Sequence, residues 1–107
     1  PALGAYPNPA GMTARNSHET QKGYLISGRV QGVGFRHWTT RNARELGLRG
    51  TVRNRADGRV ELHVAGPRAD VETLEGRLDE GPRAARVRGV ESMESDRDLP
   101  DDFRVVR

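Results

Sequence analysis

Apolar and polar positions along the 107-residue chain alternate in short runs and recur at helical spacing in longer ones. The alternating or short apolar runs predict strands at residues 24–27, 50–55, 59–64, 86–91 and 103–106. Helical spacing predicts helices over 35–46 and 71–78, each followed by a glycine. The predicted order is therefore β-α-β-β-α-β with one added strand.

This order favours one particular arrangement of layers. The Asp57-Gly58 turn between the second and third strands is a strong hairpin signal. Two helices and one sheet can bury a single sheet face, so we predict an α+β fold of the ferredoxin-like type: an antiparallel sheet with both helices on one face. The first two strands should run in the same direction and end at the same edge, with the third strand between them and their backbones roughly 10 Å apart.

The beginning of the chain has no such pattern. Residues 1–21 contain three prolines and two glycines, and their apolar residues have no period. We interpret them as a disordered N-terminal tail and residues 22–107 as one domain. Met12 is a candidate natural start, which leaves open whether residues 1–11 are native.

Composition excludes several function classes. The chain has no cysteine, so disulfides, thiol nucleophiles and zinc–thiolate sites are excluded. This agrees with a reducing cytoplasm, where we expect the protein to reside. No apolar run approaches the roughly 18 residues of a membrane span, and no signal-peptide pattern is present, so no membrane partner is expected.

The net charge of +3 is unevenly distributed. Between Lys22 and Val60 there are nine basic side chains and two acidic ones, whereas the rest of the chain after Val60 is net acidic. A solvated arginine-rich surface explains most of these arginines. One or two of them could instead draw an anion to this half of the chain.

A glycine-rich loop lies within the basic half. Residues 28–36 read G-R-V-Q-G-V-G-F-R and join a predicted strand to a predicted helix. Glycines let successive N–H groups turn inward as a nest that suits phosphate, and the helix adds its positive end. A plain tight turn is the alternative. Arg36 favours phosphate, because a cation in the first helical turn is unfavourable unless an anion is bound nearby.

The topology brings Asn54 towards this loop. Asn54 stands near the end of the second strand, at the sheet edge where the first strand also ends. Its amide can accept from a water molecule and donate to an incoming oxygen. From spacing alone, that role and a turn-flanking role beside Asp57-Gly58 stay equally open.

These segments together resemble the acylphosphatase family. The resemblance rests on G-R-V-Q-G-V-G-F-R at 28–36, A-R-E-L-G-L-R-G-T-V-R-N at 43–54, D-G-R-V-E at 57–61 and G-P-R-A-A-R-V at 81–87. It covers about residues 22–107, and no departure occurs at the positions that matter.

The resemblance implies metal-free hydrolysis of the carboxyl–phosphate bond of small acyl phosphates by a monomer. Arg36 would bind the phosphate, and Asn54 would position the attacking water. Inorganic phosphate would be a product and an inhibitor; no metal, cofactor or nucleic acid is expected. The phosphate-binding backbone amides would be those of Gln31, Gly32, Val33, Gly34, Phe35 and Arg36.

Other conspicuous side chains are interpreted as structural. Neighbouring helical residues point about 100° apart, so His37 is not expected to share a site with Arg36. His63 is placed on the exposed face of its strand, and no histidine pair has metal-ligand spacing. Phe35 and Trp38 are expected in the core or anchoring the loop. The aspartates at 96, 98, 101 and 102 are expected in a solvated loop without a calcium site.

Two rival functions remain. Single-stranded RNA binding occurs on the same fold but needs aromatics on the central strands, and here only Tyr24 qualifies. The second rival is a non-catalytic acylphosphatase-like module that serves a larger system. The presence of both Arg36 and Asn54 favours catalysis.

Overall fold

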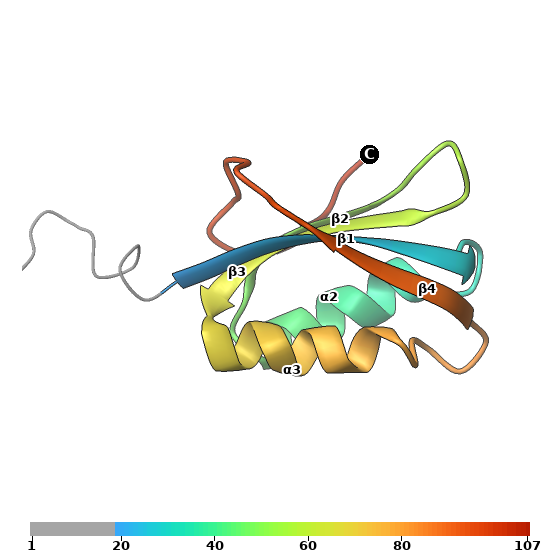
Figure 1. Cartoon of the computed structure of the whole chain (residues 1–107), viewed down its shortest axis with the longest axis horizontal. Helices are drawn as coiled ribbons and strands as arrows, with labels where there is room; N and C mark the ends of the chain where they lie inside the picture. The colour runs from blue at the N-terminus through green and yellow to red at the C-terminus, as the bar shows by residue number, and fades with distance from the viewer. Residues whose placement is uncertain (1–18) are drawn as a thin grey trace, which may run out of the picture.

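The computed structural model describes residues 19–107 and shows two helices packed on one face of a five-stranded sheet (Figure 1). The strands are β1 Glu19–Arg29, β2 Arg49–Asn54, β3 Val60–Pro67, β4 Arg86–Met93 and β5 Phe103–Val105. The helices are α2 Phe35–Glu45 and α3 Arg68–Leu78. This confirms the ferredoxin-like α+β prediction. Neither helix is long and apolar enough to cross a bilayer.

The sheet order is β4-β1-β3-β2-β5. Both β1 and β2 are antiparallel to β3, so they run in the same direction with β3 between them, as predicted. Tyr24 of β1 and Val52 of β2 both pair with Leu62 of β3. The added strand β5 lies parallel to β2 at the edge, and the Val106 N–H donates to the Val52 carbonyl at 2.9 Å.

The core lies between the sheet and the helices. Alternate strand residues point into it, because successive side chains of a strand face opposite sides. Full burial of each large apolar side chain contributes roughly 1.5–3 kcal/mol. Tyr24 is among these buried residues, and its hydroxyl donates to Glu75 of α3 at 2.7 Å. The largest fully buried apolar side chains are Tyr24, Phe35, Phe103, Ile26, Leu62, Leu74, Leu78, Val30, Val52, Val60, Val64 and Val71.

The first strand begins earlier than predicted. Glu19, Thr20 and Gln21, assigned to the tail, pair with the last residues of β3. The Glu19 carboxylate also accepts two hydrogen bonds of 2.9 Å from Arg49. Pairing with a long partner strand therefore orders these polar residues without an apolar pattern of their own. The predicted disorder of residues 1–18 lies outside the described part of the chain.

Two predicted strand ends were also wrong. Gly28 does not end β1, which continues to Arg29 past a register irregularity between Ser27 and Gly28. A Cβ at Gly28 would lie 2.2 Å from the Arg86 carbonyl oxygen, so glycine permits the close approach of β4. The third predicted strand likewise does not end at residue 64, since β3 continues to Pro67 and α3 follows directly at Arg68.

The loop of residues 94–102, here called the strap, crosses the sheet face opposite the helices. Its four aspartates are exposed, as predicted. The strap is nevertheless tied down: Gln21 donates to the Arg97 carbonyl at 2.9 Å, and Arg49 donates to the Leu99 carbonyl at 3.0 Å. The prediction of an exposed His63 was wrong, since the strap leaves only 4% of it exposed and Ser95 bonds its Nδ1 at 2.7 Å.

Candidate active site

The loop between β1 and α2 takes a left-handed backbone at two glycines. Gly32 has φ 75° and Gly34 has φ 82°. A Cβ at either position would meet no atom within 4 Å, so space does not require these glycines. The backbone conformation requires them, because side chains rarely adopt positive φ.

The backbone N–H groups of this loop have no partner within residues 19–107. None of the amides from Gln31 to Arg36 donates to a carbonyl or side chain there; the first helical bond runs from Trp38 N–H to Gly34 O at 3.0 Å. The first turn of α2 carries no acidic residue, and Gly34 gives no side-chain cap. Free N–H groups at a nest and a helix N-terminus form an anion-binding site.

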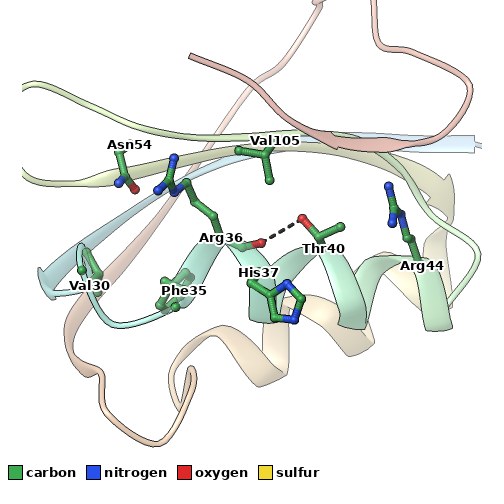
Figure 2. Close-up of a pocket in the computed structure, with 10 residues that line it drawn as sticks. Val30, Phe35, Arg36, His37, Thr40, Arg44, Asn54 and Val105 are labelled. Atoms are coloured by element: carbon green, nitrogen blue, oxygen red, sulfur yellow. Dashed lines mark hydrogen bonds between the residues drawn. The ribbon is translucent and has the colours of Figure 1, made fainter.

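Arg36 extends from the first turn of α2 towards the end of β2, where its guanidinium lies close to Asn54 (Figure 2). It is exposed and has no ion pair within residues 19–107. The two arginines that flank Asn54 in the sequence, Arg53 and Arg55, are by contrast both paired with Glu61. Arg36 therefore keeps its planar donor fork available for two oxygens of an anion.

Asn54 is the last residue of β2 and presents an unsatisfied acceptor. Its Oδ1 is buried, and no group of residues 19–107 donates to it. Buried side-chain acceptors nearly always have a partner, so one left without any points to a bound water or ligand. The orphaned oxygen fits the water-binding reading of Asn54 better than the turn-flanking one.

These groups line one open cavity of about 470 Å³. Among the predicted site residues, Gly32, Gly34, Phe35, Arg36 and Asn54 line it, whereas Gln31 and Val33 do not. The structure thus brings the strand–loop–helix segment and the end of β2 to one place, as the topology predicted.

Gln31 has a different role for its side chain. Its Nε2 donates to the Arg55 carbonyl at 2.8 Å and to the Arg59 carbonyl at 3.0 Å. Both acceptors belong to the hairpin that joins β2 and β3. This tether between the loop and the hairpin was missed, because no local pattern relates residue 31 to residues 55 and 59.

Sequence reasoning also missed five lining residues. His37 was expected to face away from the site, yet it lines the same cavity; its ring projects to the side away from Asn54 (Figure 2). Phe35 and Trp38 are packed as predicted, with ring centroids 5.4 Å apart. The unpredicted lining residues are Val30, His37, Thr40, Arg44 and Val105.

A buried carboxylate supports the end of β2 from the opposite sheet face. Glu61 is 3% exposed and accepts from Arg53 at 2.8 Å and from Arg55 at 3.2 Å. Burial raises the pKa of Glu61, but hydrogen bonds from His63 and Arg53 outweigh it and lower the pKa from 4.5 to about 2. Because Asn54 lies between the two anchored arginines, strand alternation directs it to the cavity side.

The titratable groups offer no metal centre in the described chain. No group of three or more His, Asp or Glu side chains of residues 19–107 could hold a metal ion.

Known proteins with the same architecture were found by sequence and by structure. A protein named acylphosphatase from Koribacter versatilis is 53% identical over 85 residues, which are 78% of this chain and 76% of the relative. An acylphosphatase structure from Coxiella burnetii matches 89% of this chain and 100% of its own, with TM-score 0.82 and 40% identity. Full-length HypF, in phosphate- and nucleotide-bound form, matches 83% of this chain but only 12% of its own, with TM-score 0.76 and 28% identity.

Fold and comparisons together define a small hydrolase of ferredoxin-like topology. The family model described as acylphosphatase matches residues 22–105, nearly all of the described chain. The chain belongs to the acylphosphatase family, which confirms the resemblance noted from the motifs.

Proposed function

We propose that this acylphosphatase binds the phosphate of its substrate with the loop amides of residues 31–36 and Arg36, and that Asn54 orients the attacking water. The observation that carries this proposal is the convergence of three unsatisfied groups on one cavity. These are the free loop N–H groups, the unpaired Arg36 guanidinium and the orphaned Asn54 Oδ1.

The reaction needs little more than these groups. The water oxygen bonds to phosphorus while the bond from phosphorus to the carboxyl oxygen breaks, and its electron pair leaves on the carboxylate. The two water protons end on the inorganic phosphate. Because a carboxylate is a weak base, the leaving group needs no general acid. Catalysis is then positioning and charge stabilisation, which is what phosphoryl transfer chiefly requires.

Each group has one task in this scheme. The amides and Arg36 face charge that spreads over the phosphoryl oxygens in the transition state. Asn54 Oδ1 accepts a hydrogen bond from the water and so turns an oxygen lone pair towards phosphorus. Gln31 holds the loop against the hairpin that carries Asn54. No metal ion has a task in it, so we propose metal-free hydrolysis with inorganic phosphate as product and inhibitor.

The test is turnover of acetyl phosphate, assayed with a chelator present. We expect Arg36→Ala to abolish turnover and inhibition by phosphate. Arg41→Ala is the matched control, because Arg41 is exposed on the same helix and lines a different cavity beside Trp38. Undiminished activity of Arg36→Ala would refute the site, and loss of wild-type activity in chelator would refute the metal-free mechanism.

RNA binding receives no support from the described strands. Tyr24, the aromatic on which it depended, is fully buried under α3 and cannot stack on a base. On the opposite sheet face, Glu61 and His63 lie beneath the strap. The match to 12% of HypF shows the same domain architecture inside a longer protein. Arg36 and Asn54 at one cavity favour catalysis over a purely structural module here.

We further propose that the enzyme acts as a monomer in the cytoplasm. Within residues 19–107 the only exposed large apolar side chain is Val105, so no apolar patch invites a partner. The absence of cysteine from the chain agrees with a reducing compartment. Light scattering of the purified protein and fractionation of its native host would test the two statements.

A further inference from the structure

The cavity continues beyond the phosphate-binding groups along α2. Arg36, Thr40 and Arg44 follow one another at spacing i, i+4 and i+8, so they lie on one stripe of the helix (Figure 2). At 1.5 Å per residue the stripe spans about 12 Å. All three line the cavity, whose volume of about 470 Å³ is in the range that holds small organic molecules rather than a single phosphate. Part of it is therefore left for the acyl group.

Arg44 places a second cation at the far end of this stripe. Its Nη2 donates to the Phe103 carbonyl at 2.9 Å, which fixes the guanidinium between α2 and β5. It has no carboxylate partner within residues 19–107. Glu45, which follows Arg44 in α2, pairs instead with Arg77 of α3. The remaining guanidinium donors of Arg44 are available to an anion.

Val105 supplies an apolar wall opposite the stripe. It lies in β5, lines the cavity and is 47% exposed. Figure 2 shows its side chain directed towards the helix stripe between Arg36 and Arg44. An aliphatic acyl chain of about six carbons, extending from the phosphate, would run past Val105 and Thr40 and end at Arg44.

We propose that this half of the cavity selects acyl groups with an anionic end, so that the preferred substrates are acyl phosphates of dicarboxylic acids of about six carbons, long enough to follow the stripe. Arg44 is the specificity-determining residue and Val105 the contact for the methylene groups. The inference rests on the proposed phosphate site at the other end of the cavity. It adds the class of acyl group that this site accepts.

The experiment compares adipyl phosphate with hexanoyl phosphate, which have the same number of carbons and differ by one terminal carboxylate. We expect the wild-type kcat/KM to be roughly tenfold higher for adipyl phosphate, since a charge-assisted hydrogen bond is of this strength. Arg44→Gln should reduce the adipyl-to-hexanoyl ratio to near one. Arg44→Lys should restore part of it.

Arg41→Gln is the control, because it removes the same charge from the same helix outside this cavity. It should leave the ratio unchanged; an equal fall in both variants would mean that the field of the whole surface, and not Arg44, selects the anion. A wild-type ratio near one, or a ratio unaffected by Arg44→Gln, overturns the inference. Failure to hydrolyse either compound would overturn the proposed function itself.

Discussion

Gln31 and Arg55 are joined across the site by a hydrogen bond of 2.8 Å from the Gln31 side-chain amide to the Arg55 carbonyl. The same amide reaches the Arg59 carbonyl at 3.0 Å. One side chain thus fixes the loop of residues 31–36 to the hairpin that begins directly after Asn54. The distance between the proposed phosphate site and the proposed water site at Asn54 therefore depends on this tether.

Gln31→Ala should weaken phosphate binding roughly tenfold and lower kcat/KM at least as much, because two hydrogen bonds of about 1 kcal/mol each no longer order the loop. Isothermal titration with inorganic phosphate and acetyl phosphate kinetics would measure both effects. Gln21→Ala is the matched control. Its Nε2 also makes two hydrogen bonds, but to the strap. Equal phosphate affinity in the two variants would rule out the tether.

Asn54→Ala should reduce kcat by roughly two or more orders of magnitude, as expected when a group that orients the nucleophile is removed. Phosphate inhibition should stay close to wild type, because the loop amides and Arg36 remain in place. Steady-state kinetics with phosphate as inhibitor separates the two effects. A variant that lost phosphate inhibition together with turnover would show that Asn54 binds the phosphate rather than the water.

Glu61 gives the stability a defined pH dependence. Its pKa falls from 4.5 to about 2 on folding, so the unfolded state binds the proton more readily. The stabilisation is complete above pH 4.5 and is lost as the pH falls towards 2. Denaturant unfolding at a series of pH values should show this decline, and Glu61→Gln should flatten it. Glu72→Gln, which removes an exposed carboxylate, should leave the slope nearly unchanged.

Two glycines should respond to alanine with opposite signs. Gly34 has φ 82°, so Gly34→Ala should lower the free energy of unfolding by about 1–2 kcal/mol and weaken phosphate binding. Gly76 lies inside α3 with no atom within 4 Å of an added Cβ. Gly76→Ala should raise the free energy of unfolding by about 0.5–1 kcal/mol without changing kinetics. Thermal and denaturant melts would measure both, and a stabilised Gly34→Ala would contradict the requirement for a left-handed backbone there.

Much of the fold followed from local patterns. Apolar alternation and the Asp57-Gly58 turn predicted the hairpin, and the crossover helix fixed the parallel directions of β1 and β2. That topology alone brought Asn54 to the loop. Local patterns predict a feature correctly where neighbouring residues determine both a strand and the strand it pairs with, as in the hairpin of β2 and β3.

The remaining features depend on contacts between distant segments. Strand alternation placed His63 on the outer face correctly, but nothing near residue 63 indicates that Ser95 and the strap cover it. The ordering of residues 19–21 depends likewise on β3 and Arg49. Arg44 lines the cavity because β5 lies beside α2 and its Phe103 carbonyl accepts a hydrogen bond from Arg44. The position of β5 could not be predicted, because a strand of three residues has too short a pattern to indicate its neighbours.

The edge position of β5 has a consequence for self-association. Its parallel pairing occupies the outer side of β2, leaving β4 as the other border of the sheet. β4 carries the exposed cations Arg86 and Arg88, which discourage the addition of a foreign strand. Any chain that did extend the sheet at β4 would be separated from Asn54 by β4, β1 and β3. In aggregates formed by strand addition at β4, the cavity beside Asn54 would therefore stay open to solvent.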